Sequence, residues 1–214
     1  MKEAIYIIGG GSSIGGIDLR SLRDKITVTV NKSLFVVPDS EYFITVDYSF
    51  VNKFRNRILS AITSTATYSV FIANMGHTEL KKDSHGYHDT KWDIRYNLSC
   101  FNEVIESPRV DGIGVDIDDF RTGDNSGFCA MQLAVLLGYT EIYLLGIDLH
   151  ATPQATHFHG GYGQPFQRFE SDLERYYTYF KTALEELAIK KPDVKVYSCS
   201  PSSRLNNIIP YVKL

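Results

Sequence analysis

The sequence has 214 residues, 43% of them hydrophobic, which is enough to bury the core of one full domain. Its formal net charge of −3 and pI of 6.1 exclude nonspecific electrostatic binding of nucleic acid, so small ligands or glycans are the expected partners. No apolar run reaches the roughly 18 residues that span a membrane, and the first residues lead into a strand rather than a signal peptide, so we expect a cytoplasmic protein. The uneven spacing of Cys100, Cys129 and Cys199 favours reduced thiols over disulfides or a zinc site.

Apolar segments alternate along the chain in the manner of an α/β protein. Short apolar or β-branched runs predict the strands, which fall at 4–8, 26–30, 42–46, 68–72, 142–145 and 194–197. Longer apolar runs or helical spacing predict the helices, at 48–60, 128–137 and 169–187, with Pro192 ending the last one. We therefore expect a single Rossmann-like domain over 1–214, with a mostly parallel sheet flanked by helices.

The first predicted strand runs directly into a glycine-rich turn, GGGSSIGG at 9–16. Glycines let backbone N–H groups approach an anion closely, and Ser12 and Ser13 add hydroxyl donors. The turn lacks the lysine of a phosphate-binding P-loop, and its glycines fit the dinucleotide-binding spacing only loosely. A phosphate-binding turn and a plain connection between a strand and a short helix both remain open.

A polar segment without clear periodicity follows the strand at 68–72. It contains His77, His85, His88 and Trp92. We expect a loop or lid over 74–98, because long loops within compact domains are commonly functional.

The stretch 123–148 is the most informative part of the chain. Its helix is too uniformly apolar for a surface position, so it should be buried against the sheet, with Gly138 as its left-handed C-terminal cap. The strand at 142–145 should be covered on both faces, as in a parallel sheet, and Asp148 follows its carboxyl end, where ligands bind in such sheets.

Polar residues recur just after predicted strands or just before predicted helices. They are Asn31, Asp47, Asn125, Ser126 and Asp148. Asn, Asp and Ser also favour turns and helix N-caps, so each of them has a structural alternative. Their common position, together with the glycine turn, favours a ligand site at one edge of the sheet.

Five segments of the chain resemble the bacterial sialyltransferases of glycosyltransferase family 42 and a wider group that includes phage-encoded proteins and archaeal-type hydroxymethylpterin pyrophosphokinases. The segments resemble the family's nucleotide-contacting glycine turn, strand-end asparagine, Thr-Ser-Gly helix start, Gly-Tyr-Lys-Glu-Ile-Tyr strand with its Gly-Ile-Asp end, and closing Cys-Pro-Asn-Ser turn. They are, in that order, 7–14, 30–31, 125–127, 138–148 and 195–205.

The resemblance implies a GT-A-like fold and a nucleotide site. Its donor would be a nucleotide-sugar such as a CMP-sugar, its acceptor a glycan or a small molecule, and a homo-oligomer is compatible with it. No cofactor is implied as a requirement. The predicted nucleotide-binding residues are Gly9, Gly10, Gly11, Ser12, Ser13, Asn31, Asn125, Ser126, Gly127, Asp148 and His150.

The chain departs from the family where the chemistry takes place. The asparagine and proline of the family's first turn are Gly10 and Ser12 here. The family's tyrosine pair, which supports the leaving phosphate, has His150 at its first position and no second tyrosine at the matching distance. The family's catalytic histidine lies between the Gly-Ile-Asp strand and the next helix, an interval that holds His157 and His159 here. One of these would act as the general base that removes a proton from the acceptor hydroxyl. A loop whose imidazoles only bond backbone groups is the structural alternative.

Metal binding is a second open chemistry for the same histidines. His157 and His159, with Asp148, His150 or an aspartate of 116–119, offer imidazole and carboxylate ligands for a divalent ion. A metal would favour a diphosphate-transferring kinase, because transferring phosphates need their charge neutralised. A catalytically silent nucleotide-binding protein is the third open function.

Overall fold

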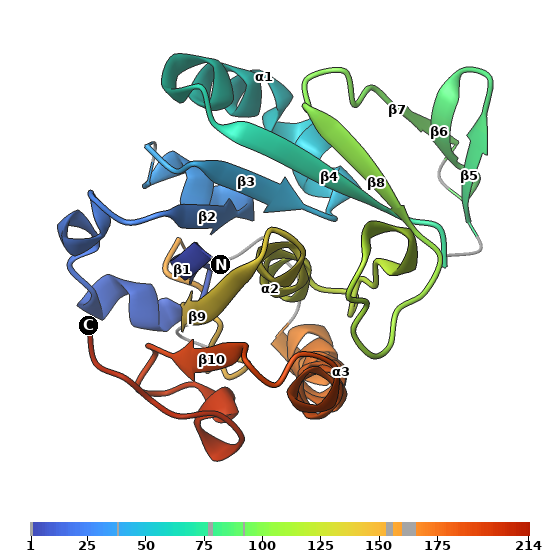
Figure 1. Ribbon diagram of the computed structural model, residues 1–214. Helices are drawn as coiled ribbons and strands as arrows, with labels where there is room; N and C mark the ends of the chain where they lie inside the picture. The colour runs from blue at the N-terminus through green and yellow to red at the C-terminus, as the bar shows by residue number, and fades with distance from the viewer. Residues whose placement is uncertain (1, 38, 77–78, 92, 153–155, 160–165) are drawn as a thin grey trace.

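Seven strands form one parallel sheet in the order β10-β9-β1-β2-β3-β4-β8 (Figure 1). The computed structural model describes residues 2–37, 39–76, 79–91, 93–152, 156–159 and 166–214. The strands are β1 Lys2–Ile8, β2 Thr27–Val30, β3 Tyr42–Thr45, β4 Tyr68–Asn74, β8 Glu103–Ser107, β9 Tyr139–Leu145 and β10 Lys195–Ser198. This arrangement confirms the predicted α/β class and its parallel sheet.

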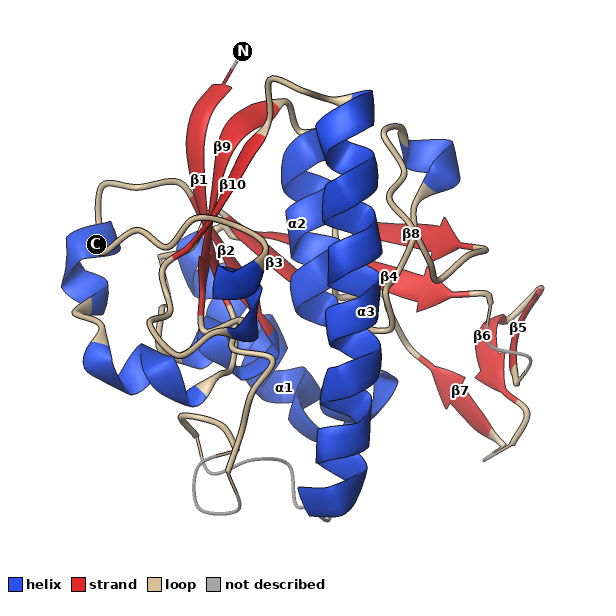
Figure 2. Cartoon of the chain, turned by 90° about the horizontal axis from the view of Figure 1, so that it is seen from below, coloured by secondary structure: helices blue, strands red, loops and turns tan. Residues whose placement is uncertain are grey.

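Helices cover both faces of this sheet. The α-helices are α1 Tyr48–Thr65, α2 Ser126–Leu136 and α3 Phe166–Lys190, and the short 3-10 helices are η1 Ser12–Gly16, η2 Leu19–Leu22, η3 Asn31–Phe35, η4 Ile117–Asp119 and η5 Arg204–Asn207. Figure 2 shows α2 and α3 side by side on one face. Successive residues of a strand point to opposite faces. Accordingly Ile72 of β4 packs in the core beneath α2 and α3, whereas Phe71 packs with Phe50 and Ile58 of α1.

The helix boundaries follow from local chemistry. α1 begins where the Asp47 carboxylate accepts a hydrogen bond from the N–H of Phe50 at 2.9 Å, and it ends at Ala66, which takes a left-handed conformation with φ of 54°. The helix is therefore longer than the predicted 48–60. α2 is buried throughout its first ten residues, as its apolar sequence predicts. Gly138 has a φ of 82°, so the predicted left-handed turn after this helix is confirmed.

The segment 74–98 differs from the irregular loop expected from the sequence. It holds three short antiparallel strands, β5 Leu80–Asp83, β6 Gly86–Asp89 and β7 Ile94–Tyr96, and these form a separate sheet beyond β8 (Figure 1). Each strand buries only one side chain, namely Leu80, Tyr87 and Tyr96, so the alternation of apolar and polar residues is too brief to be recognised. His77 and Trp92 lie outside the described residues, and the role of a lid stays a prediction.

The three cysteines carry free thiols. Cys129 and Cys199 are buried and Cys100 is half-buried, in agreement with the sequence prediction of reduced thiols. Burial raises the pKa of all three thiols, that of Cys199 to about 11, so none is a reactive thiolate near neutral pH. Within the described ranges, no helix is both long and apolar enough to cross a membrane.

Candidate functional site

The strand order creates a crevice beside β1. β1 lies between β2 and β9. The strands that follow β1 are added on the β2 side as far as β8, and β9 and β10 are then added on the opposite side of β1. Ligands of open α/β sheets bind at such a switch point, outside the carboxyl ends of the strands. A cavity of about 120 Å³ lies there. Among the sequence-predicted residues, its walls include Gly9, Gly10, Gly11, Asn31, Asn125, Ser126, Gly127, Asp148, His150 and His157.

The glycine turn packs closely against the end of β9. The N–H of Gly9 donates to the carbonyl of Leu145 at 2.7 Å, and the N–H of Gly11 donates to the carbonyl of Gly146 at 2.8 Å. A Cβ at Gly9 would overlap Ile147, and one at Gly11 would overlap the Asp148 carboxylate. These two glycines are therefore required by close backbone approach.

Gly10 differs from Gly9 and Gly11 because the position where a side chain would be attached faces His157 and His159. A Cβ there would lie 3.3 Å from Cδ2 of His157 and 3.6 Å from Nε2 of His159. The carbonyl of Gly10 also accepts a hydrogen bond from the N–H of Phe158 at 3.2 Å. The turn and the 156–159 segment thus form two walls of one site.

The Asp148 carboxylate stabilises the glycine turn through hydrogen bonds to Ser13. Its carboxylate accepts the N–H of Ser13 at 3.0 Å and the hydroxyl of Ser13 at 2.5 Å, and the same hydroxyl lies 2.8 Å from that of Ser200. Both carboxylate oxygens are engaged, and only 4% of Asp148 is exposed. The structure therefore gives Asp148 and Ser13 a supporting role, and Ser13 does not line the cavity among the described residues; nor does Ser12.

Two asparagines present their amide groups to the cavity, and each has its oxygen already engaged. Oδ1 of Asn125 caps α2 by accepting from the N–H groups of Gly127 and Phe128, at 2.8 and 3.1 Å. Oδ1 of Asn31 accepts the hydroxyl of Thr45 at 2.7 Å, and Asn31 has a left-handed φ of 53°. Because both amide oxygens already accept hydrogen bonds within the protein, the side-chain NH₂ groups are the groups that can donate to a ligand.

Ser126 also has a structural partner, because its hydroxyl accepts the N–H of Val46 at 3.1 Å. This bond joins the start of α2 to the end of β3. A hydroxyl has one donor besides its acceptor sites, so Ser126 can still donate to a bound group.

The two predicted catalytic histidines stack on one another beside the glycine turn. The ring centroids of His157 and His159 lie 4.8 Å apart, and the ring of His157 also lies 4.8 Å from that of Phe169 of α3, tilted by 32°. Burial lowers the pKa of His157 to about 4, with further contributions from the neighbouring His159 and Lys32. His157 is therefore a neutral imidazole at pH 7, with a nitrogen able to take up a proton.

A second cavity of about 820 Å³ adjoins the first. It extends between the start of α1, the β5–β7 sheet and the first turns of α3, and its walls include Asp47, Tyr48, Tyr96, Arg168 and Arg175. Both cavities share Asn31, Asn125, Ser126, His157, Phe169 and Tyr176. The two cavities therefore form one continuous site with His157 at the junction.

An ion-pair network ties α3 to the sheet edge within this second cavity. Arg175 lies 3.0 Å from the Asp172 carboxylate and 3.7 Å from that of Asp124, which also accepts the amide of Asn74 at 2.9 Å. Burial raises the pKa of the Asp47 carboxyl above its ordinary value. This larger cavity therefore combines carboxylates, amides, arginines and aromatic rings.

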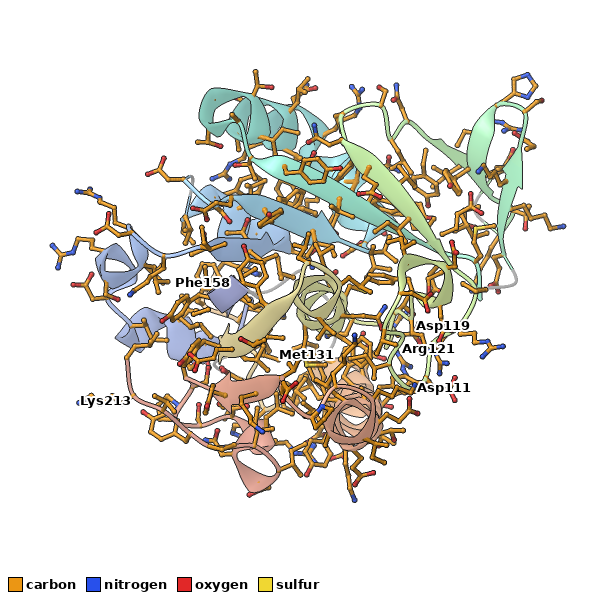
Figure 3. The ribbon with its side chains drawn as sticks, viewed as in Figure 1. Asp111, Asp119, Arg121, Met131, Phe158 and Lys213 are labelled. Atoms are coloured by element: carbon orange, nitrogen blue, oxygen red, sulfur yellow. The ribbon has the colours of Figure 1, made fainter. Side chains whose placement is uncertain are left out.

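The surroundings of the proposed metal ligands bear on a divalent ion, whose binding stays a prediction. Nζ of Lys32 lies 3.4 Å from Nδ1 of His159, and an ammonium group at this distance opposes a second cation. Asp119, considered above as a ligand, pairs instead with Arg121 at 3.0 Å, away from Phe158 and its neighbouring histidines (Figure 3). Over the described ranges, no group of three or more His, Cys, Asp or Glu side chains is placed to hold a metal.

Several residues in or near the cavity were not predicted from the sequence. Phe169, Leu173 and Tyr176 of α3 line the cavity, and burial raises the pKa of the Tyr176 hydroxyl to about 12. These residues have the same helical spacing as the core residues that follow them, so spacing alone does not separate a ligand-facing turn from a core-facing one. Lys32 follows the predicted Asn31 directly, but no pattern in the sequence connects it to His159.

No model of a known protein family matches the chain, and no curated protein matches it. Solved structures of sialyltransferases do match. The sialyltransferase CstII from Campylobacter jejuni, in complex with the substrate analogue cytidine-5'-monophosphate, has a TM-score of 0.55 and 18% identity, and the match covers 99% of this chain and 85% of that one. The complex of CstII with CMP-3FNeuAc gives a TM-score of 0.53 and 17% identity, over 99% and 86% of the two chains.

A variant of CST-II in complex with CMP matches with the same score, identity and coverage as the CMP-3FNeuAc complex. These findings give no support to the wider grouping with phage proteins and pterin pyrophosphokinases. At 17–18% identity, the likeness concerns the arrangement of the backbone. The chain has the α/β, GT-A-like fold of the sialyltransferase CstII.

Proposed function

We propose that this protein is a glycosyltransferase that binds a nucleotide-sugar, with a CMP-sugar as the leading candidate, and transfers the sugar to a hydroxyl of an acceptor. One observation carries the proposal: His157, a neutral imidazole, lies at the junction of two cavities. A base for sugar transfer must contact the acceptor hydroxyl next to the donor's anomeric carbon, and this junction is where two substrates would meet. The fold shared with CstII, which binds CMP and CMP-3FNeuAc, supports the choice of donor.

The two cavities suit the two substrates. The smaller cavity offers the amides of Asn31 and Asn125 to the nucleotide, between the glycine turn and α3. The larger cavity offers carboxylates, amides and the rings of Tyr48 and Tyr96, a mixture that suits a polyhydroxylated acceptor.

The reaction would proceed by direct displacement at the anomeric carbon. The acceptor oxygen forms a bond to this carbon while the bond from the carbon to the phosphate oxygen breaks, and the electron pair leaves with the phosphate. His157 takes the acceptor's proton. Its low pKa, caused mainly by burial, limits its strength as a base in the free protein, and the negative charge of a bound phosphate would raise that pKa.

The test combines ligand binding with sugar transfer. We expect CMP and a CMP-sugar to raise the melting temperature without added metal, because a ligand at ~100 times its Kd stabilises by about 2.7 kcal/mol. His157→Ala should lower turnover by ~10²–10⁴ and leave CMP binding intact. His85→Ala, at an exposed histidine on the β5–β6 turn, is the matched control and should change neither. Full turnover in His157→Ala would overturn the assignment of the base.

The same measurements separate the other two functions. A diphosphate-transferring kinase should bind ATP only with Mg²⁺, and the ammonium group of Lys32 beside His159 does not favour such a site. A silent binding protein should bind the nucleotide without any sugar transfer.

A further inference from the structure

The glycine turn by itself is poorly equipped to hold a phosphate. The N–H groups of Gly9 and Gly11 donate to backbone carbonyls of β9 and the turn after it, and the N–H of Ser13 donates to Asp148. Within the described ranges, Gly10 is the one glycine of 9–11 whose N–H donates to no backbone carbonyl. A bound phosphate therefore needs donors from another part of the protein.

His159 lies next to Gly10, and Lys32 lies next to His159, so this pair can supply such donors. Lys32 belongs to η3, directly after Asn31, and its Nζ lies 3.4 Å from Nδ1 of His159. An ammonium group only donates, so Nδ1 must accept and the ring proton is then on Nε2. Nε2 is the ring atom that lies toward Gly10, 3.6 Å from where a Cβ would be. His159 thereby places a buried N–H donor beside Gly10, which lines the smaller cavity.

Further positive charge stands behind this pair. Lys53 and Arg57 of α1 approach Lys32 closely enough to lower its pKa, after burial as the larger cause. Aromatic rings hold the three cations in place: Nζ of Lys32 lies 5.5 Å and that of Lys53 5.7 Å from the centroid of the Phe54 ring, and the guanidinium of Arg57 lies 4.0 Å from that of Phe35. Like charges gathered around Lys32 repel one another, and an anion bound beside His159 would reduce that repulsion.

We propose that His159, positioned by Lys32, holds the phosphate of the departing nucleotide. This inference rests on the proposed function. His159 donates its Nε2–H to a phosphate oxygen. Lys32 is a positioning residue, which fixes the tautomer of His159 and contributes positive charge as the phosphate takes the electron pair of the breaking bond. The acceptor's proton goes to His157, so the two histidines have different roles.

Inorganic phosphate is the probe for this subsite, because it does not depend on the identity of the base or the sugar. We expect nitrogen-detected NMR of the unaltered protein to show His159 as the Nε2–H tautomer, and phosphate to shift its ring signals. Lys32→Met should weaken phosphate and CMP binding by about 10- to 100-fold, because it removes a positive charge near the phosphate and no longer fixes the tautomer of His159. Affinity for cytidine, which lacks the phosphate, should stay within about twofold.

Two variants control for loss of charge and loss of fold. Lys181→Met removes a lysine from the exposed side of α3 and should leave phosphate binding unchanged. Lys32→Arg keeps the charge and should retain more of the phosphate affinity than Lys32→Met. A His159 ring that phosphate does not perturb, an Nδ1–H tautomer in the unaltered protein, or equal affinity in Lys32→Met would each overturn the proposal. If phosphate binding depends on Lys32 while neither CMP nor any nucleotide-sugar binds, the subsite stands and the glycosyltransferase function fails.

Discussion

Asp148, just beyond β9, accepts hydrogen bonds from both the N–H and the hydroxyl of Ser13, at 3.0 and 2.5 Å. The two residues are 135 positions apart in the sequence, and their contact ties the glycine turn after β1 to the end of the neighbouring strand. A carboxylate this deeply buried is tolerated because its oxygens are satisfied by hydrogen bonds. The geometry of the turn, and thus of the site, depends on this pair.

Ser13→Ala should therefore destabilise the fold. It removes the hydroxyl donor from a buried carboxylate oxygen, which costs about 1–3 kcal/mol. Ser12→Ala, one residue earlier and without such a partner in the described structure, should stay within about 0.5 kcal/mol of the unaltered protein. Urea unfolding measures both free energies. Equal stabilities for the two variants would show that the Asp148–Ser13 bond has no energetic importance.

The second prediction distinguishes three of the five glycines of the turn at 9–16. Gly10→Ala places a methyl group against His157 and His159, so it should weaken binding of CMP by about tenfold or more while the melting temperature changes little. Gly15→Ala puts a methyl group into open space and should leave binding unchanged.

Gly11→Ala should instead lower stability, because its methyl group would overlap the Asp148 carboxylate. Thermal unfolding with and without CMP distinguishes these effects. If Gly10→Ala binds CMP as well as the unaltered protein does, the open side of the turn is not part of the ligand site.

The sequence predicted the strands of the parallel sheet well where they are buried on both faces. The run Ile142 to Leu145 is apolar because α2 covers one face of β9 and the short helices and the C-terminal segment cover the other. β8 was missed because it is the last strand of the sheet and carries Glu103 and Glu106. The β5–β7 sheet was missed because only one side chain per strand reaches the core.

Only those residues of the candidate site that lie at the ends of predicted strands or the start of a predicted helix could be predicted from the sequence. Gly10, Asn31 and Asn125 follow from the pattern of strand, turn and helix, since the carboxyl ends of parallel strands meet at one edge. The contact of Lys32 with His159 and the place of Tyr176 in the cavity did not follow, because both depend on how η3 and α3 pack in three dimensions. The sequence also could not show that the side-chain oxygens of both asparagines are already used within the fold.

The third prediction concerns acid stability. The pKa of His157 is about 4 in the folded protein and ~6.5 in an unfolded chain, so the unfolded state binds the proton first as the pH falls. The stability that His157 contributes is present above pH ~6.5 and is lost as the pH falls toward 4. His157→Asn should therefore lose less stability between about pH 7 and pH 5 than the unaltered protein loses. Unfolding in urea at the two pH values tests this, and His85→Asn, at an exposed site, should behave like the unaltered protein.

The last prediction divides the two roles of Asn125. Its oxygen caps α2, and its amide nitrogen is the group left for a ligand. Serine is about as good an N-cap as asparagine but has no amide, so Asn125→Ser should keep the stability of the fold within a few tenths of a kcal/mol and still weaken CMP binding. Asn125→Ala loses both functions and should also cost about 1 kcal/mol of stability.

The two substitutions together separate capping from recognition. Urea unfolding gives the stability of each variant, and calorimetric titration with CMP gives the affinity. If Asn125→Ser binds CMP as tightly as the unaltered protein does, Asn125 is a helix cap alone, and the nucleotide must be recognised from the other wall of the cavity, where Asn31 offers the same amide group.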